Sequence, residues 1–306
     1  MALSPNLRGA LFMSIAMAGF TINDTLMKSV SASMNMGQAM LLRGIFATAL
    51  LLLLAARENV PMRPGMLMQK HVLIRTVGEV GATVTFLLAL FQLPLAIVTA
   101  VLQALPLGVT LGAALIFSEP VGWRRWGAII AGFLGILIIV RPGFEGFSAW
   151  SLCALASVVF CVIRDLATRR IPRAVPTSLV STATSVSVTL CGALLVQPFG
   201  GWTPVTLSDT APLAAGAIAL VFGYQFIIAA MREGDISFIA PFRYTGLLWA
   251  IILGYIVFGD VPDAAMLVGG AVVVASGLYA LYREQVVGKK RPITESTGPG
   301  MAPDGT

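Results

Sequence analysis

Residues 94–117 read PLAIVTAVLQALPLGVTLGAALIF and contain no charged side chain. An α-helix of this length extends about 36 Å at 1.5 Å per residue, which exceeds the roughly 30 Å hydrocarbon thickness of a bilayer. A run of this length and apolarity is typical of a transmembrane helix rather than of a helix in a soluble core. The stretch therefore places the chain in a membrane, and the rest of the sequence has to be interpreted with lipid as the solvent.

The composition supports this interpretation along the whole chain. Of 306 residues, 57% are hydrophobic and 11% are charged, and the mean hydropathy is +0.89. Soluble domains carry about 25% charged residues. Long apolar runs also exclude an outer-membrane barrel, whose strands alternate polar and apolar residues. The formal charge of +6 comes without a Lys/Arg face interleaved with aromatic residues, so nucleic-acid binding is not expected.

The few cysteines and the single histidine limit the site chemistry that the chain can carry. Cys153, Cys161 and Cys191 lie inside apolar runs without CxxC or Cys/His spacing, and His71 stands at the start of a run. A disulfide framework or a zinc site needs more ligands than these. GxxxxGK[ST], HExxH and GxSxG motifs do not occur, which argues against ATP hydrolysis and enzymatic catalysis. We therefore expect no metal, no cofactor and no enzyme activity.

Apolar runs of span length follow one another along the chain. A hydropathy window places ten of them, at 9–27, 37–56, 72–91, 94–117, 126–140, 149–165, 176–197, 211–231, 236–258 and 264–282. Turn residues and charges separate them, as in Arg141-Pro142-Gly143. We predict an all-α integral membrane protein with ten transmembrane helices. Residues 284–306, rich in Gly, Pro, Ser and Thr, are predicted to form a disordered cytoplasmic tail.

An internal repeat divides the chain into two halves of five runs. A shift of 141 residues, with one residue of slippage near the end, aligns similar residues: Leu11/Leu152, Ile22/Ile163, Asp24/Asp165, Lys28/Arg169, Ala89/Ala230, Phe117/Phe258, Gly127/Gly269, Gly135/Gly277 and Arg141/Arg283. An odd number of spans makes the second copy enter the membrane from the opposite side. We predict two inverted five-helix repeats, residues 1–141 and 142–283, an architecture typical of secondary transporters. The first run can also be read as a cleaved signal peptide, although it has a counterpart in the sixth run.

Basic residues in the loops predict the orientation. With the amino terminus inside, the cytoplasmic segments collect fourteen Lys and Arg residues, whereas the outer loops collect only Lys28 and Arg141. This bias places both termini in the cytoplasm. It also agrees with an even number of spans.

Two segments resemble the repeat ends of EamA-type carriers in the drug/metabolite transporter superfamily. One is LPLGVTLGAALIFSEPVGWRRWGAIIAGFLGILIIVRPG, from 105 to 143, and the other is APFRYTGLLWAIILGYIVFGDVPDAAMLVGGAVVVASGLYALYRE, from 240 to 284. Arg43, Glu119-Pro120 and Pro241-Phe242 match as well, whereas Asp260 stands where the family more often has Glu. The resemblance covers nearly the whole chain in span count and spacing.

The resemblance implies a carrier of a bacterial-type inner (plasma) membrane, with a central cavity between its two halves. It does not identify the substrate, because this superfamily moves vitamins, amino acids, nucleotide-like metabolites and drugs in either direction. The second half looks most like the riboflavin-uptake and S-adenosylmethionine-uptake groups. A vitamin such as riboflavin is therefore one expectation, and export of an amino acid or drug is the alternative.

Charged residues within the spans are the first candidates for function. They are Asp24, Arg43, Arg75, Glu79, Asp165 and Arg243. A charge at a helix centre costs roughly 2.5–3.5 kcal/mol on insertion scales, so such residues tend to be paired or functional. Arg75 and Glu79 are four residues apart on one helix face. They either form an intrahelical ion pair that eases insertion or line the cavity, where Glu79 carries a proton or binds a cationic group. Arg43 and Arg243 are either structural or substrate-binding.

Asp24 and Asp165 are repeat mates near the ends of the first and sixth runs. We expect each to pair with the cation four residues on, Lys28 and Arg169 respectively. The alternative is a pair of gate networks, one on each side of the membrane.

Proline inside an apolar run indicates a broken helix. Pro106 in the fourth run and Pro241 in the ninth lie in repeat mates. Backbone groups freed in lipid need a protein partner or a wet cavity, so matching breaks in inverted halves indicate a binding site. Near these breaks stand the polar and aromatic candidates Gln103, Tyr244, Tyr224, Gln225 and Trp249. Aromatic residues at helical spacing can equally be packing.

These patterns favour a secondary transporter that moves a small organic metabolite through the lipid bilayer by alternating access. An integral-membrane enzyme or a scaffold is the alternative of another class. The predicted substrate-binding residues are Arg43, Arg75, Glu79, Gln103, Tyr224, Gln225, Arg243, Tyr244 and Trp249. The predicted coupling or gate residues are Glu79, Asp24 and Asp165, with protons as the expected coupling ion.

Overall fold

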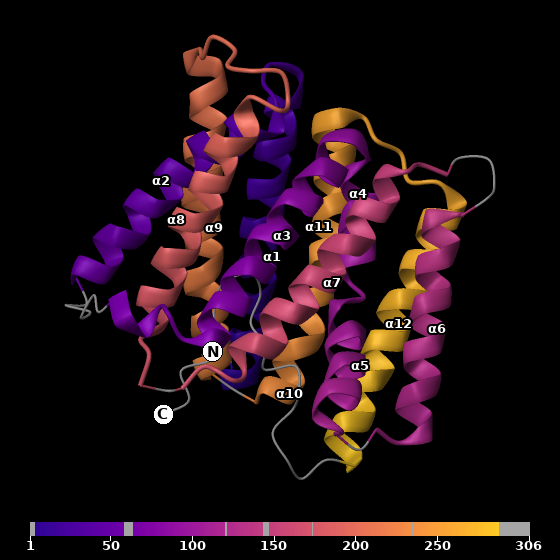
Figure 1. Cartoon of the computed structure of the whole chain (residues 1–306). Coiled ribbons are helices and arrows are strands. Elements are labelled where there is room, and N and C mark those ends of the chain that lie inside the picture. The colour runs from indigo at the N-terminus through magenta and orange to yellow at the C-terminus, as the bar shows by residue number, and fades with distance from the viewer. Residues whose placement is uncertain are drawn as a thin grey trace.

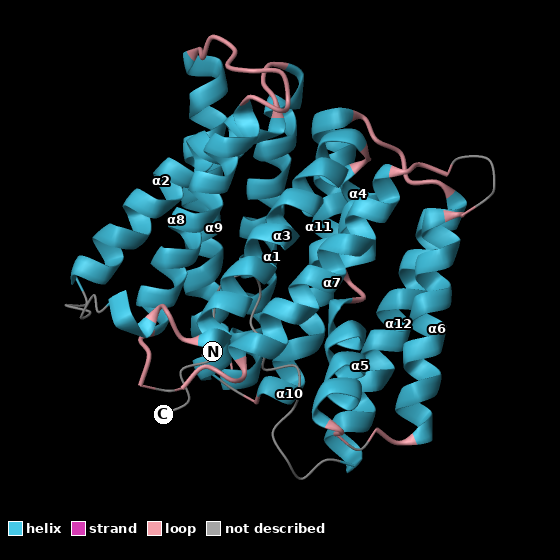
Figure 2. Cartoon of the chain, in the orientation of Figure 1, coloured by secondary structure: helices cyan, strands magenta, loops and turns pink. Residues whose placement is uncertain are grey.

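The protein is a bundle of membrane-length helices. A computed structural model describes residues 4–57, 64–119, 121–142, 147–172, 174–233 and 235–287. Within these ranges every regular element is a helix (Figure 2). Ten helical spans are long and apolar enough to cross a bilayer, and each coincides with one predicted run. The prediction of an all-α integral membrane protein with ten transmembrane helices is confirmed.

Most spans are single helices. Span one is α1 (Pro5–Ser29) with the short η1 (Val30–Ala32), and η2 (Pro64–Met66) follows span two. The other unbroken spans are α2 (Met36–Arg57), α3 (Lys70–Gln92), α6 (Trp123–Val140), α7 (Trp150–Thr168), α8 (Thr177–Val196), α9 (Leu207–Glu233) and α12 (Ala264–Val287). Because α12 continues to Val287, the start predicted for the tail falls inside a helix. The rest of that tail, 288–306, lies outside the described residues.

Spans four and nine are broken, as their prolines predict. Span four consists of α4 (Leu95–Leu102) and α5 (Leu105–Phe117), and Pro106 stands in the first turn of α5, where a missing N–H leaves no helical hydrogen bond unmade. Span nine consists of η3 (Ala240–Tyr244), α11 (Thr245–Leu253) and the π-helical η4 (Gly254–Phe258), and α10 (Ile236–Ile239) precedes it. The two interruptions occupy equivalent places, since Gln103 and Tyr244 are separated by the repeat shift of 141.

The helices pack in a pattern that is unchanged when the two halves are exchanged. α1 packs along α9 and α7 along α3, while α2 packs along α8 and α6 along α12. Replacing each span by the span five places away reproduces the same set of pairs. Figure 1 shows α2 and α8 at one edge of the bundle and α6 and α12 at the other. The pattern is what two related repeats would give, and the inverted repeat itself stays a prediction.

Glycine allows α2 and α8 to touch backbone to backbone. A Cβ on Gly37 of α2 would lie 2.6 Å from the carbonyl carbon of Leu195, and a Cβ on Gly192 of α8 would lie 2.7 Å from the amide nitrogen of Leu41. Lipid gives no hydrophobic drive for helix association, so such close van der Waals contact stabilises the pair.

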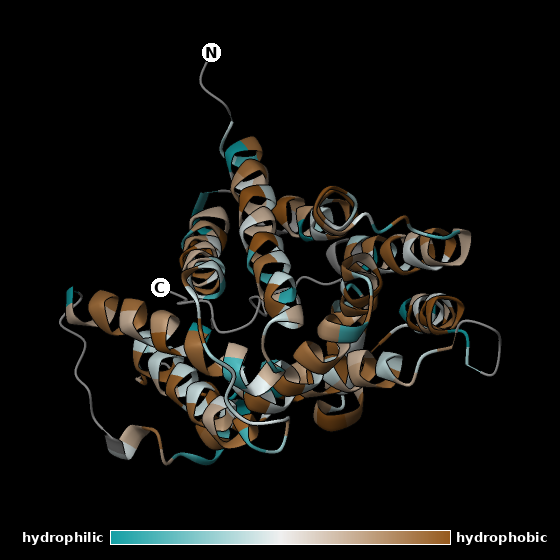
Figure 3. Cartoon of the chain, turned by 90° about the horizontal axis from the view of Figure 1, so that it is seen from above, coloured by the Kyte–Doolittle hydropathy of each residue, from teal (hydrophilic) through white to brown (hydrophobic). Residues whose placement is uncertain are grey.

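The outside of the bundle is apolar. Many large hydrophobic side chains remain exposed, among them Leu115 at 69%, Leu194 at 77% and Ile256 at 70%. Seen along the bundle, hydrophobic residues occupy most turns of the helices (Figure 3). Such a surface needs lipid around it, which makes the chain a multi-pass membrane protein.

Candidate functional site

A cavity lined by both apolar and polar side chains lies inside the bundle, between spans from both halves. Its volume is about 170 Å³. In this measure one water needs about 10–15 Å³, so the cavity has room for roughly ten waters or for a small organic molecule. Spans one, two, three, four, six, seven and eight contribute to its wall. The polar side chains in the wall are Asn23, Asp24, Arg43, Arg75, Glu79, Thr83, Arg164, Ser181, Thr184, Ser185 and Tyr224.

Five of the residues predicted from sequence meet in this cavity. They are Asp24, Arg43, Arg75, Glu79 and Tyr224. These residues come from α1, α2, α3 and α9, so the fold gathers positions that are up to 200 residues apart in the sequence. Their contact with a substrate stays a prediction.

The other predicted residues do not line the cavity. Gln103 lies at the break in span four, where its Nε2 is near Gly246 of α11. Trp249 donates its indole N–H to the carbonyl of Ser14 over 3.2 Å, which ties α11 to α1. Tyr244 is buried, and its hydroxyl has no hydrogen-bond partner. The remaining residues outside the cavity wall are Gln225, Arg243 and Asp165.

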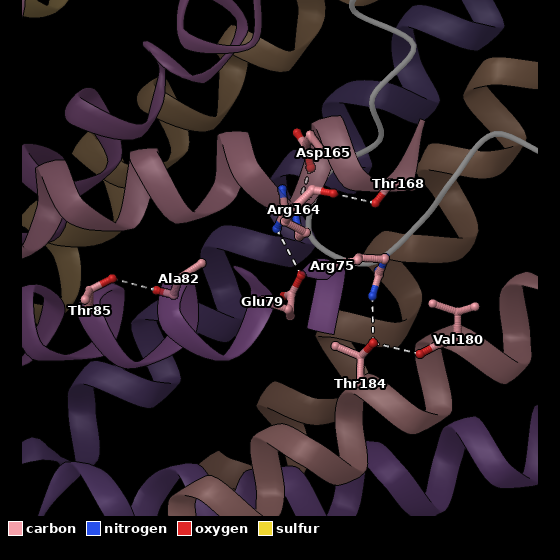
Figure 4. A network of polar contacts seen from close by, with 9 residues as sticks. All are labelled: Arg75, Glu79, Ala82, Thr85, Arg164, Asp165, Thr168, Val180 and Thr184. Atoms are coloured by element: carbon pink, nitrogen blue, oxygen red, sulfur yellow. Dashed lines mark hydrogen bonds and ion pairs between the residues drawn. The ribbon is translucent and has the colours of Figure 1, made fainter. Parts of the chain in front are cut away.

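A buried arginine on α7 organises the ion pairs beside the cavity (Figure 4). Arg164 is 1% exposed, and its Nη1 donates to Oε2 of Glu79 over 3.2 Å. Its Nε donates to Oδ1 of Asp165 over 2.7 Å. One guanidinium thus compensates two carboxylates, which lowers the cost of placing both inside a membrane.

Arg75 does not form the intrahelical ion pair that its spacing from Glu79 suggests. Its Nη1 instead donates to Oγ1 of Thr184 on α8 over 2.6 Å, while the carboxylate of Glu79 pairs with Arg164. α3 packs against both α7 and α8, and each of the two side chains finds its hydrogen-bond partner on one of those helices. The second reading of these two residues, that they line the cavity, agrees with their placement.

A second polar group lies on the wall formed by α1 and α2. Arg43 donates from Nη1 to Oδ1 of Asn23 over 3.4 Å, and the amide of Asn23 donates to Oδ1 of Asp24 over 2.9 Å. The Nε atom of Arg43 is buried without a hydrogen-bond partner. This wall therefore presents an unused donor of Arg43 beside a carboxylate that is hydrogen-bonded to a neutral amide.

The expected helix-end pairs of Asp24 and Asp165 are not formed. Lys28 donates to the carbonyls of Leu90 and Leu93 at the end of α3 instead of to Asp24. Arg169 pairs with Glu119 over 2.9 Å, and Asp165 pairs with Arg164. α1 and α7 both extend beyond the apolar runs that the sequence predicts, so these acids face the interior while the cations four residues on reach other spans.

Repeat mates line the cavity in pairs. Seven pairs of lining residues are separated by 141 positions: Phe20/Cys161, Asn23/Arg164, Arg43/Thr184, Gly44/Ser185, Ala47/Val188, Glu79/Leu220 and Thr83/Tyr224. The bond between Asn23 and Asp24 also repeats in the second half as the bond between Arg164 and Asp165. The two members of a pair occupy equivalent places, but their charges can differ, since Arg43 is the mate of neutral Thr184 and Arg164 is the mate of neutral Asn23. A nearly symmetric cavity thus carries an asymmetric set of charges.

Metal chemistry finds no support in the described part of the chain. Among those residues, no group of three or more His, Cys, Asp and Glu side chains could hold a metal ion. The charged groups at the cavity are instead arranged as hydrogen-bonding and ion-pairing groups, which can bind a charged solute or exchange a proton.

The sequence model of the EamA-like transporter family matches residues 7–141. The matched segment, just under half of the chain, is similar to an EamA-like transporter domain. This domain supplies Asp24, Arg43, Arg75 and Glu79, and the rest of the chain supplies Arg164, Thr184 and Tyr224 to the same cavity. The resemblance seen in the sequence is therefore confirmed.

Relatives over most of the chain are transporters by name. The riboflavin transporter of Vibrio cholerae is 26% identical, over 88% of this chain and 91% of its own. The pseudopaline exporter of Pseudomonas aeruginosa is 26% identical, over 88% and 94%. The S-adenosylmethionine uptake transporter of Rickettsia prowazekii is 22% identical, over 93% and 96%. The three relatives share transport as their named function, while their solutes and directions differ from one another.

A solved crystal structure shares the fold of this chain. The two superpose with a TM-score of 0.61 at 20% sequence identity, over 92% of this chain and 99% of the other. At that identity the likeness concerns the arrangement of helices alone.

Arg164 and Thr184 are two of the polar cavity residues that were not among the site residues predicted from sequence, although Arg164 counts with Arg43, Arg75 and Arg243 as a basic residue within a span. Arg164 stands next to Asp165 at the end of the run 149–165, where a hydropathy window stops because of the charges themselves. α7 continues to Thr168, so Arg164 lies a full turn inside the helix. The repeat held the missing signal, because Arg164 is the mate of Asn23 and Thr184 is the mate of Arg43.

Proposed function

We propose that the protein is a secondary transporter that moves a small organic metabolite across a bacterial-type inner membrane by alternating access. The observation that carries the proposal is the cavity between spans of both halves of a ten-span bundle, in which charged side chains lie within a largely apolar wall. Secondary transporters bind their substrate between inverted repeats, near the bilayer midplane. Two further observations support this assignment: the helix packing is unchanged when the two halves are exchanged, and seven pairs of repeat mates line the cavity.

Arg43 and Arg75 are the groups that we propose to hold the solute. Each donates to a neutral acceptor, Asn23 or Thr184, and neither forms an ion pair with a carboxylate of the described residues. A guanidinium has five donors in a fork that suits carboxylate and phosphate groups. The solute that we propose therefore carries an anionic group.

The apolar part of the solute would contact the aromatic side of the cavity. Phe20 and Tyr224 pack edge to face with ring centroids 5.2 Å apart, and both line the cavity together with Phe86. These rings offer a flat surface for a conjugated or aliphatic group. Gln103 and Tyr244, the candidates near the helix breaks, would support the wall from behind rather than touch the solute.

Glu79 is the group that we propose to couple transport to protons. It lines the cavity and is joined to Arg164, so its protonation would weaken a contact between α3 and α7. Asp24, whose carboxylate accepts from Asn23, is the second candidate. The loop charges predict that both termini lie in the cytoplasm, and in that orientation an inward proton gradient would supply protons to these acids when the cavity opens to the outer side.

Reconstituted vesicles test the proposal. Purified protein is inserted into liposomes, and riboflavin, S-adenosylmethionine, amino acids and carboxylated or phosphorylated metabolites are offered one at a time. Accumulation or counterflow of an unchanged compound supports a transporter, and its direction under a gradient separates import from export. A chemically altered product would point to an integral-membrane enzyme, and absence of movement for every compound would favour a scaffold.

A further inference from the structure

Spans four and nine end in the same local structure. Phe117-Ser118-Glu119 closes span four and Phe258-Gly259-Asp260 closes span nine, separated by the repeat shift of 141. The middle residue is left-handed in both, with φ of 53° at Ser118 and 70° at Gly259. The amide of each acid then turns back to its helix, from Glu119 to the carbonyl of Ala113 over 3.4 Å and from Asp260 to that of Gly254 over 3.1 Å. These are the reversed hydrogen bonds of a Schellman-type helix end.

The left-handed turn directs a phenyl ring and a carboxylate toward one cation. At the end of span four, the guanidinium carbon of Arg169 lies 5.6 Å from the ring centroid of Phe117, and Nη2 donates to Glu119 over 2.9 Å. At the end of span nine, Nζ of Lys28 lies 5.3 Å from the ring centroid of Phe258 and interacts electrostatically with Asp260. Such cation–π contacts are attractive at these separations.

The two cations are also repeat mates. Lys28 ends α1 and Arg169 follows α7, and they are 141 positions apart. We call each of these two helix ends, with the cation that it contacts, a corner. At each corner the cation of one half therefore meets the ring and the acid of the other half. The cation, the ring and the acid of one corner each have a counterpart at the other, which a chance surface contact does not explain.

The corners lie at opposite ends of the bundle. In Figure 1 span four runs from α4 at the upper side to α5 at the lower side, whereas span nine runs from α10 at the lower side through α11 to the upper side. Their closing turns therefore face opposite membrane surfaces. Each corner joins the first span of one half to the fourth span of the other.

The corners differ in how far their contacts are made. Glu119 is bonded to Arg169, and Arg170 adds a second cation 4.3 Å from the centroid of Phe117. At the other corner Oδ2 of Asp260 is buried without a hydrogen-bond partner, and Lys28 is bonded to the end of α3. One corner is therefore closed by a hydrogen-bonded ion pair, whereas the other is held by the ring contact and a longer-range attraction between Lys28 and Asp260.

We infer that these corners are two matched latches that hold alternate ends of the cavity closed. The latches are Arg169 with Phe117 and Glu119, and Lys28 with Phe258 and Asp260. The inference rests on the proposed transport function, since alternating access requires that each end closes while the other opens. The partly exposed ion pair of Arg169, at 33% and 28% for its two side chains, is weak enough to break in every cycle.

Thiol labelling tests the latches without any substrate. Cys161 lines the cavity, so in a Cys153→Ala/Cys191→Ala background a membrane-impermeant maleimide reaches it only through an open end. Oriented vesicles present one membrane surface or the other to the reagent. We expect Arg169→Gln to raise labelling about threefold to fivefold from the surface at which span four ends, and to lower it from the opposite surface. Lys28→Gln should produce the reverse pattern.

Two further sets of variants keep the inference falsifiable if a glutamine variant folds poorly. Phe117→Leu and Phe258→Leu weaken only the ring contact and should shift labelling in the same directions by smaller factors. Lys28→Arg retains the charge and should label like the parent. Arg124→Gln is the control, because Arg124 stacks over Trp123 at 5.2 Å with no counterpart 141 positions on.

Equal labelling changes from both surfaces, or no change in any latch variant, would overturn the latches. Because the readout needs no solute, side-specific labelling without transport would overturn the proposed function and leave the latches standing. If the protein transports a solute but no latch variant alters the labelling, the latches would be overturned and the proposed function would stand.

Discussion

Arg164 on α7 donates from Nη1 to Oε2 of Glu79 on α3 over 3.2 Å, and this bond joins the two halves of the chain at the wall of the cavity. The same guanidinium holds Asp165 through Nε, while its Nη2 is buried without a partner. Protonation of Glu79 would neutralise one of the two carboxylates that pair with the guanidinium of Arg164. A site of this kind can link the charge state of a carboxyl to the contact between two spans.

Glu79→Gln should abolish proton-driven uptake and retain part of the exchange activity. The amide still accepts the hydrogen bond of Arg164, but it cannot take up a proton. We expect gradient-driven accumulation to fall at least about tenfold, while counterflow of labelled solute continues. Glu233→Gln is the control, because Glu233 pairs with Arg8 at the surface. An uptake rate that still follows the pH gradient would show that the coupling group lies elsewhere.

Arg164→Met should destabilise the protein more than the change in packing explains. It leaves Glu79 and Asp165 as two buried carboxylates without a cation, and breaking a buried ion pair costs about 3–5 kcal/mol. Combining Arg164→Met with Glu79→Gln and Asp165→Asn removes the uncompensated charges and should recover most of the loss. Thermal unfolding in detergent measures both. If the triple variant were as unstable as the single one, the role of Arg164 would be packing rather than charge compensation.

The span pattern could be predicted from hydropathy because every span except four and nine is an uninterrupted apolar helix. The site could be predicted only in part. Arg43, Arg75 and Glu79 stand well inside their runs, so the cost of burial marks them. Arg164 was hidden, because charges at the end of a run look like a helix terminus.

The hydrogen-bond partners that side chains find on other helices also could not be predicted from the sequence. Spacing alone pairs Arg75 with Glu79 and Lys28 with Asp24, since positions four apart share a helix face. The structure pairs them with Thr184 and with the end of α3 instead. Such contacts depend on which helices are neighbours, and local spacing carries no information about that.

Arg43→Gln should discriminate between charged and neutral solutes. Charge-assisted hydrogen bonds contribute about 1.5–3 kcal/mol, so losing one should weaken binding of an anion about tenfold or more. Riboflavin and riboflavin 5′-phosphate form a matched pair of probes with the same ring, used in binding or competition assays with the vesicles. We expect the phosphate to bind the parent more tightly and to lose affinity selectively in the variant. Arg8→Gln, at the surface, serves as the control. Equal effects on both probes would place the anionic group elsewhere.

Tyr224 and Tyr244 should behave differently when mutated. Tyr224→Ala removes an aromatic wall of the cavity and should raise the apparent Km severalfold at normal membrane abundance. Tyr244→Phe removes a buried hydroxyl that has no hydrogen-bond partner, so stability should stay the same or rise by about 1 kcal/mol, with the Km unchanged. Transport kinetics and thermal unfolding of the two variants decide the matter. A higher Km in Tyr244→Phe would move the site toward the break in span nine.

Gly192→Ala should separate α2 from α8 and impair folding. Its Cβ would lie 2.7 Å from the backbone nitrogen of Leu41, and backbone cannot yield as a flexible side chain can. Overpacking of this kind costs about 1–3 kcal/mol, and here it falls between two helices that line the cavity. Gly127→Ala is the matched control, because nothing lies within 4 Å of the Cβ that it would add. Membrane abundance and detergent melting should drop for Gly192→Ala alone. A Gly192→Ala variant that is stable and has a wider cavity would contradict this expectation. It would mean that α2 and α8 can separate without loss of stability. Their close contact would then belong to one conformation of the transport cycle rather than to the fold.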